Sequence, residues 1–127
     1  MIKKMRNNGQ WTEARFNSFI KSALRAASRR WPPKFGALKK AYTCNKKNIK
    51  TNRMSKHYTC AQCRGLFPTS EVEVDHINPV VPVTGFTTWG EVIERMFCEE
   101  EGFQVLCRTC HSVKSTAERA KRKKYNG

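Results

Sequence analysis

The sequence predicts an α+β protein, in which a helical extension precedes a small module of short strands and helices. Three observations predict this fold class. Apolar residues recur at three- and four-residue spacing over residues 12–31, which indicates an amphipathic helix. Residues 71–75 alternate strictly between polar and apolar, which is typical of a half-buried strand. Two Cys-x-x-Cys pairs, residues 60–63 and 107–110, enclose that strand, so we expect a tetrahedral zinc ion at the centre of the module.

The length and the cysteine content restrict the class of protein. With 127 residues, the chain has room for one compact domain and a helical appendage. Six cysteines are compatible with disulfides in a secreted protein, but the polar amino terminus lacks the apolar stretch of a signal peptide. The paired spacing then favours reduced thiols that bind zinc, with Cys44 and Cys98 as small hydrophobic residues outside the site. The most apolar stretch, residues 79–86, is too short to span a membrane, and we expect a cytoplasmic location.

The positive charge is concentrated in one part of the sequence. The net charge is +15, and residues 1–57 contain sixteen basic residues and a single acidic one. Residues 58–127 have nine of each, with most acidic residues between positions 71 and 101 and a basic tail. Solubility alone would explain a basic composition, but such an uneven distribution favours a nucleic-acid partner. We therefore interpret residues 1–57 as a basic helical extension and linker, and residues 58–127 as the zinc module.

The extension is expected to contain two helices and a linker. Thr12 is a suitable N-cap for the first helix, and the prolines at positions 32 and 33 end it. A short second helix is predicted over residues 34–42, and residues 44–57 are polar and basic as a linker would be. The basic face of the first helix is either solvated or in contact with phosphate groups, and its lack of acidic residues favours phosphate. We expect the DNA contacts to come from Arg15, Lys21, Arg25, Arg29 and Arg30.

Three more elements are predicted within the module. A helix over residues 89–97 is expected, because Thr88 and Glu91 have the spacing of a capping box. A short strand, residues 104–106, leads into the second cysteine pair, and a terminal helix follows that pair. Strand 71–75 and the terminal helix then present four polar residues, Asp75, His76, His111 and Lys114. Aspartate and histidine are the residue types that hydrolyse phosphodiesters together with a hard divalent ion.

Two motifs resemble those of a known protein family. They are Val-Asp-His-Ile-Asn-Pro at residues 74–79 and Leu-Cys-Arg-Thr-Cys-His at residues 106–111, followed by Lys114. Together they are similar to HNH endonucleases of the ββα-metal fold, especially the branch with a four-cysteine zinc site that is abundant in bacteriophages. The resemblance covers roughly residues 58–118. It implies a DNA endonuclease in which two strands and a helix surround a catalytic metal ion.

The resemblance implies a role for each of the four polar residues. His76 matches the general base, and a pKa of about 6.5 would leave its imidazole largely neutral at pH 7. Asp75 and His111 match the ligands of a catalytic Mg²⁺, Mn²⁺ or similar ion, and we expect Lys114 to contact the same phosphate. Structural roles are the alternative: His111 as a spare ligand on the zinc side, and Asp75 as a cap at the end of its strand.

One position departs from the family pattern. Where the family has an asparagine that braces the loop of the general base, this chain has Gly102. A glycine has no side chain for that task, and Gln104 and Asn78 are the candidate substitutes. The base and both ligands remain, so we expect activity to persist, at a lower rate or with a changed metal preference.

Two interpretations from other functional classes remain open. The chain is alternatively a zinc-dependent DNA-binding or DNA-processing protein without catalysis, or a scaffold for a protein partner. The first of these leaves the position of the Asp-His pair unexplained. For the endonuclease we expect DNA as partner, no membrane, and a monomer or weak dimer in the host cytoplasm if a phage encodes it. Homing, host DNA degradation and genome processing all fit such an enzyme.

Overall fold

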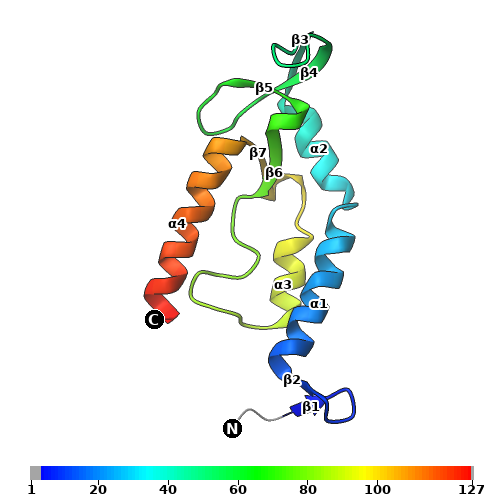
Figure 1. Ribbon diagram of the computed structural model, residues 1–127, viewed down its shortest axis with the longest axis vertical. Helices are drawn as coiled ribbons and strands as arrows, with labels where there is room; N and C mark the ends of the chain where they lie inside the picture. Colours follow the sequence, from blue (N-terminus) through cyan, green and yellow to red (C-terminus); the bar gives the residue numbers. More distant parts are fainter. Residues whose placement is uncertain (1–3, 127) are drawn as a thin grey trace. The chain divides into compact units, whose positions relative to one another are not determined.

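The contacts within the chain divide it into two compact units. The computed structural model describes residues 4–126 (Figure 1). The first unit ends at Trp31 and the second begins at Pro32. Each proline nitrogen lacks a hydrogen to donate, so the paired prolines suit a break between two helices. The boundary predicted from the sequence lies later in the chain, after residue 57, whereas the contacts place the division after Trp31.

The first unit consists of a small hairpin and a long helix. Strands β1 (Lys4–Arg6) and β2 (Trp11–Thr12) pair antiparallel, and helix α1 (Glu13–Ser28) follows directly. The predicted N-cap is confirmed, because the Thr12 side chain accepts a hydrogen bond from the Arg15 amide at 3.2 Å.

Aromatic and basic side chains pack together within this first unit. The Trp11 and Phe19 rings meet edge to face at 5.4 Å, and the Arg15 guanidinium lies over the Trp11 ring at 4.5 Å. Phe19 is nevertheless 57% exposed. An edge-to-face ring pair and a stacked guanidinium thus tie the hairpin to the start of α1.

The second unit contains the remaining elements, arranged around two small antiparallel sheets. One sheet has the order β3-β4-β5 and the other pairs β6 with β7. The elements in chain order are α2 (Pro32–Ala41), β3 (Tyr42–Lys47), β4 (Met54–Thr59), β5 (Leu66–Pro68), the 3-10 turn Thr69–Glu71, β6 (Val72–His76), α3 (Trp89–Met96), the 3-10 turn Glu100–Gly102, β7 (Phe103–Cys107) and α4 (Arg108–Asn126).

The core of the second unit lies around β7. Most of this strand is buried, and α2 and α4 both contact it. Helix α3 contributes Val92 and Met96, which are 0% and 1% exposed. The β6–β7 register places Asp75 opposite Gln104 and His76 opposite Phe103. Because side chains alternate along a strand, the Asp75 and His76 pairs point to opposite faces of this sheet.

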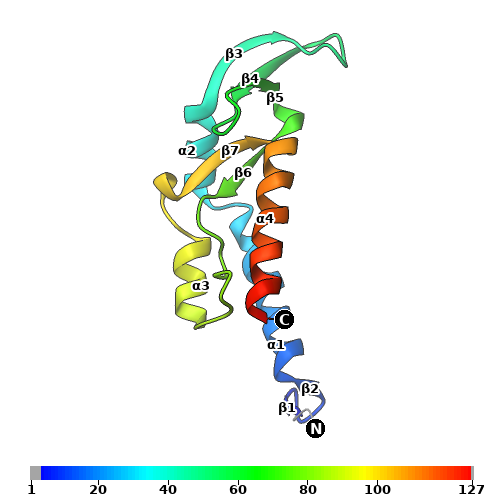
Figure 2. The same ribbon diagram turned by 90° about the vertical axis from the view of Figure 1, so that its left-hand side faces the viewer.

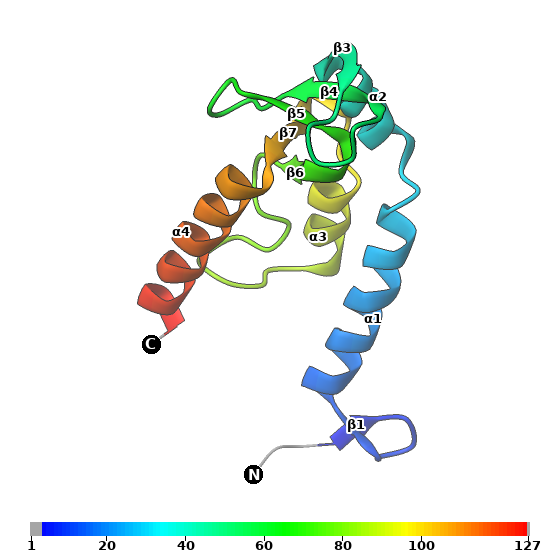
Figure 3. The same ribbon diagram turned by 45° about the horizontal axis from the view of Figure 1, so that its top comes forward.

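The connection between β6 and α3 is a loop that lies between two helices. All three ribbon views place this loop between α4 and α3 (Figures 1, 2 and 3). Arg95 of α3 donates a hydrogen bond to the Pro79 carbonyl oxygen, and Arg122 of α4 donates one to that of Val81, each at 2.7 Å. One arginine from each helix therefore anchors the loop that follows His76.

The prediction of a linker over residues 44–57 is wrong. This segment forms most of the β3–β4 hairpin, which extends away from β6 and β7 (Figure 2). The hairpin joins a three-stranded sheet through pairs such as His57 with Pro68 and Tyr58 with Phe67. The polar sequence of this segment did not indicate strands, because most side chains of the hairpin are exposed and strand propensity depends on context. The strand β5 that pairs with β4 comes from a later segment.

The other element predictions are confirmed with small changes in their bounds. The α+β class, both predicted strands of the module and its two helices are present, and Thr88 caps α3 by accepting from the Glu91 amide. Within residues 4–126, no helix combines the length and the apolar character that a membrane crossing requires.

Candidate functional site

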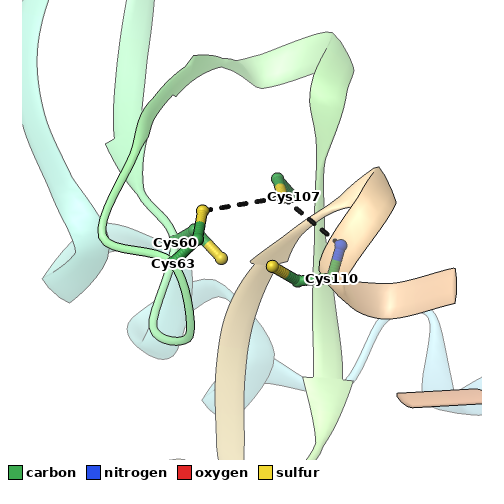
Figure 4. A group of neighbouring side chains, drawn as sticks. All are labelled: Cys60, Cys63, Cys107 and Cys110. Carbon is green, nitrogen blue, oxygen red and sulfur yellow. Dashed lines mark hydrogen bonds between the residues drawn. The ribbon is translucent and has the colours of Figure 1, made fainter. Parts of the chain in front are cut away.

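Four cysteines come together where the connection between β4 and β5 meets the end of β7 and the start of α4. Their sulfur atoms all lie within 4.8 Å of one another, and Cys63 Sγ is 4.0 Å from Cys107 Sγ (Figure 4). Four sulfurs at about 2.3 Å from a tetrahedral ion are separated by roughly 3.8 Å, so the cluster fits a metal ion such as zinc. The predicted ligand set, Cys60, Cys63, Cys107 and Cys110, is therefore confirmed as a group that could hold a metal ion.

Backbone groups support this cysteine cluster from both Cys-x-x-Cys turns, residues 60–63 and 107–110, which we call the first and second knuckle. The Gly65 amide donates a hydrogen bond to Cys63 Sγ, and the Cys110 amide donates one to Cys107 Sγ, each at 3.4 Å. The Ala61 amide donates to the Val105 carbonyl oxygen at 2.8 Å, which ties the first knuckle to β7. The two knuckles are therefore joined by main-chain contacts as well as by the shared cluster.

The acidity of the thiols differs across the cluster. Burial raises the pKa of Cys60, but backbone hydrogen bonds at Cys107 and Cys63 outweigh this effect and lower it to about 6. Hydrogen bonding to Cys107, together with burial, raises the pKa of Cys110 to about 12. Only the thiolate is a metal ligand, so metal binding releases the protons of those cysteines that are still thiols.

A second group of polar residues lies on the face of β6 that α4 covers. Asp75 is only 12% exposed at its side chain, and His111 Nε2 lies 3.6 Å from its Oδ1 atom. The Lys114 ammonium lies 3.1 Å from the Asp75 Oδ2 atom and donates to the His76 carbonyl oxygen at 3.0 Å. The structure thus brings together three of the predicted residues, Asp75, His111 and Lys114.

Lys114 is held more firmly than the sequence suggested. Besides Asp75 and the His76 carbonyl, its ammonium contacts Glu118 at 2.8 Å, one helical turn further along α4. Burial lowers the pKa of Lys114, yet its contacts with Glu118 and Asp75 raise it above the ordinary value overall. Lys114 is therefore a positively charged bridge between α4 and the end of β6.

Glu73 completes this group, although the sequence analysis did not single it out. Its Oε2 atom lies 2.9 Å from His111 Nδ1. Glu73 precedes Asp75 by two residues and so shares its face of the strand. When Nδ1 donates its hydrogen to this carboxylate, the lone pair of the ring is on Nε2 and faces Asp75. The alternation of residues 71–75 contained this signal, because both acidic residues fall on the same side.

His76 occupies the other face of β6. Its ring packs against that of Phe103 at 4.8 Å, and its Nε2 atom lies 2.9 Å from the carbonyl oxygen of Met96 at the end of α3. A carbonyl only accepts, so Nε2 carries the hydrogen and Nδ1 carries the lone pair of the neutral ring. Burial lowers the pKa of His76 below its ordinary value, and the positive charge of Lys34 adds to this.

The main chain of Gly102 braces the segment that follows His76. The Ile77 amide donates a hydrogen bond to the Gly102 carbonyl oxygen at 2.9 Å. A Cβ atom at Gly102 would collide with the Cys98 side chain, so a larger residue here requires Cys98 to move. Of the two residues named above as candidate substitutes for an asparagine at position 102, Gln104 contacts Asp75, since its Nε2 donates to Asp75 Oδ2 at 3.2 Å.

Comparisons with family models, curated proteins and solved structures find no match to this chain.

Of the basic residues proposed for DNA binding, Arg15, Lys21 and Arg25 lie on α1 of the first unit, and Arg29 and Arg30 follow directly after its last residue, Ser28. Arg15, Arg25, Arg29 and Arg30 are exposed, whereas Lys21 is half-buried. In the second unit, sequence reasoning missed Glu73, the Met96 carbonyl and Lys34 of α2. Only Glu73 was indicated by a local pattern, the alternation of polar and apolar residues over positions 71–75. The other two reach His76 from elements that are distant in sequence.

Proposed function

We propose that this protein is a divalent-metal-dependent DNA endonuclease of the HNH type, built on a ββα-metal arrangement of β6, β7 and α4. The observation that carries the proposal is the pairing of Asp75 with His111 across the strand and the helix, 3.6 Å apart, with Glu73 behind the histidine. A carboxylate and an imidazole nitrogen that converge from two elements form the start of a metal site.

The distances in this group are compatible with a shared ion. Two ligand atoms at about 2.1 Å from one ion lie about 3 to 4 Å apart, depending on the angle between them. Glu73 would orient the His111 ring, as carboxylates commonly do for histidines that bind metals. With two protein ligands, the ion would keep positions for water and for a phosphate oxygen. When bound, such an ion stabilises negative charge that develops on the phosphate.

His76 has the properties of a general base in this proposal. Its neutral form is favoured by burial, and its hydrogen bond to Met96 leaves Nδ1 as the acceptor nitrogen. The Lys114 ammonium donates a hydrogen bond to the His76 carbonyl oxygen, and the Gly102 carbonyl oxygen accepts one from the Ile77 amide. The backbone that bears His76 is thus held in place from α4 and from the turn before β7.

The charge of the chain supports DNA as the substrate. Twenty-five basic residues against ten acidic ones would bring the protein to a polyanion, while the acidic residues near β6 would attract a cation. The four-cysteine cluster would be the structural centre that holds β7 and the start of α4 against the first knuckle.

A plasmid-nicking assay tests the proposal. Supercoiled plasmid is incubated with the zinc-loaded protein and Mg²⁺ or Mn²⁺, with no added ion, and with excess EDTA. We expect nicked or linear product only with the added ion. The His111→Ala variant should lose at least about tenfold in rate at limiting ion, because metal affinity falls. Ser112→Ala, an exposed neighbour on α4, is the matched control. Absence of product for the parent protein with every ion would contradict the proposal.

One observation favours a second candidate function, DNA binding without catalysis. His76 and Asp75 point to opposite faces of β6, and His76 contacts Phe103 and Met96 rather than the Asp75 group. In that case His76 is a structural residue of the α3 side. Full DNA binding by a protein that never nicks would support this alternative.

A further inference from the structure

The β3–β4 hairpin has an unusual charge for an element of the second unit. Between positions 42 and 59 there is no acidic residue, and five residues are basic: Lys46, Lys47, Lys50, Arg53 and Lys56. Near its tip Ile49 is 96% exposed. Figure 2 shows the hairpin extending beyond the β6–β7 sheet, and all five basic residues are exposed.

The two faces of this hairpin differ. The register pairs Lys46 with Ser55 and Cys44 with His57 on one face, where His57 is only 3% exposed. That face turns toward β5 and the turn before β6, where Lys50 reaches Glu71 at 2.7 Å. The other face bears only exposed side chains along the outer part of the hairpin. We call this set the open face: Asn45, Lys47, Met54 and Lys56.

The open face continues into an aromatic groove at the base of the hairpin. Residues of α2, β3 and β4 line this groove, which has a volume of about 500 Å³. Phe35 and Tyr42 in its wall are 58% and 43% exposed, and the Tyr42 and Tyr58 rings meet edge to face at 6.0 Å. Lys39 and Lys56 also line the groove, so exposed rings and positive charges occur together there.

We propose that the open face of the β3–β4 hairpin, with this groove at its base, binds duplex DNA. The proposal deepens the function proposed above and rests on it for the choice of DNA. The B-form major groove is about 12 Å wide and admits a two-stranded β-ribbon, and a hairpin with no acidic side chain suits its phosphate walls. A duplex RNA is a poorer fit, because its deep and narrow major groove excludes such a ribbon.

Single-charge variants of neighbouring lysines test the assignment in the full-length protein. Binding of a labelled DNA duplex is measured by fluorescence anisotropy over a range of salt concentrations, with no divalent ion added beyond the zinc already bound. Lys47→Gln and Lys56→Gln alter the open face, and Lys46→Gln removes the same charge from the opposite face. A variant that neutralises one phosphate fewer should show a slope of log affinity against log salt that is lower by about 0.9.

We expect each open-face variant to lower this slope by about 0.9 and the double variant by about 1.8, with a much smaller change for Lys46→Gln. An equal effect of Lys46→Gln would show dependence on net charge alone and overturn the proposal, as would a double variant with the parent slope. The proposal would also be overturned if polyglutamate or an RNA duplex displaced the labelled DNA as well as an unlabelled DNA duplex does.

Lysine acetylation of the unaltered protein provides a second test that needs no variant. DNA should protect Lys47 and Lys56 from acetylation, as measured by mass spectrometry, and leave Lys46 reactive; equal reactivity with and without DNA would refute the assignment. Plasmid nicking by the same preparations separates the two proposals. If the parent protein nicks the plasmid but the open-face variants keep the parent salt slope, only the hairpin site is rejected. If the variants lower the salt slope but the parent protein does not nick, only the endonuclease is rejected.

Discussion

Individual side chains in the group around Asp75 have separable tasks, because each makes a different contact. Asp75 is held by Lys114 and Gln104 and faces His111. His76 lies on the opposite face of the strand and meets a main-chain carbonyl. Substitutions that keep one of these contacts and remove another can therefore test the proposed mechanism residue by residue.

His76→Gln is the sharpest test of the general base. A glutamine amide can still donate to the Met96 carbonyl, but it cannot take a proton from water. We expect nicking to fall by about two to four orders of magnitude, with DNA affinity and melting temperature close to those of the parent. The measurement is single-turnover plasmid cleavage at saturating metal ion. A variant that cleaves at the parent rate would exclude His76 as the base.

The pH dependence of cleavage should follow the lowered pKa of His76. Protonation in acid removes the acceptor lone pair, so activity is lost as pH falls through the pKa of the folded protein. Since burial holds this pKa below the ordinary value of about 6.5, the acid limb should have its midpoint below pH 6.5.

Folding stability should follow the same shift in pKa. The unfolded chain takes up its proton at a higher pH than the folded one, so this histidine destabilises the fold progressively below about pH 6.5. Cleavage rates at saturating metal ion and chemical denaturation between pH 5 and 8 measure the two effects. An acid limb centred above pH 7 would contradict the assignment of this group.

Glu73 should act through His111 and the metal ion. In Glu73→Ala the ring loses the carboxylate that orients it, and we expect the affinity for the catalytic ion to fall about 10- to 100-fold. Glu73→Gln keeps an oxygen acceptor and should lose less. Metal titration of nicking, together with isothermal calorimetry of Mn²⁺ binding, gives both values. Equal effects of the two substitutions would indicate that only the charge of Glu73 matters.

At the scale of elements, the cysteine cluster joins the first knuckle to β7 and the start of α4. Cys60 is fully buried and Cys107 is 4% exposed, and both pack with Leu106. Metal at this point therefore holds together segments that are far apart in the sequence. Loss of the metal should affect the whole second unit, because its core is small.

Cys107→Ser should yield a protein that lacks the metal and unfolds. A small domain has a total stability of roughly 5–15 kcal/mol, and loss of a structural zinc ion is expected to exceed that range or to consume most of it. Cys44→Ser, a half-buried cysteine outside the cluster, is the matched control and should retain zinc. Zinc content and thermal melting of both variants are the measurements. A cooperative melt with full zinc content in Cys107→Ser would refute the four-cysteine assignment.

For the whole molecule, the position of the division between units decides how the chain can be shortened. A cut after residue 57 would remove β3 and most of β4 from a three-stranded sheet and expose Tyr58, which is 6% exposed in the fold. A cut before Pro32 follows the division between the compact units and leaves every strand of the second unit paired.

We expect the fragment 32–127 to fold with its metal and the fragment 58–127 to be much less stable. Relative to the full chain, fragment 32–127 should bind DNA with a salt slope that is lower by several units, at about 0.9 for each phosphate contact of α1. Thermal melting, zinc content and anisotropy at several salt concentrations test both parts. An unchanged slope would show that the basic residues of α1 make no phosphate contacts.

The local sequence determined the features that depend on nearby residues. The spacing within each Cys-x-x-Cys pair indicated the four metal-binding cysteines, the Thr12 and Thr88 caps located two helix starts, and alternation over residues 71–75 located β6. Each of these signals acts over a few residues, because knuckles, caps and strand faces are set by backbone geometry within one or two turns.

Only the tertiary structure decided the features that depend on distant segments. The basic segment after α2 forms the β3–β4 hairpin, whose second strand pairs with β5, and a Cβ atom at Gly102 would collide with the Cys98 side chain. The partners of the two histidines, Glu73 and the Met96 carbonyl, likewise come from other elements. These contacts are non-local. The local sequence around a polar residue does not indicate which distant group the residue will contact in the folded protein.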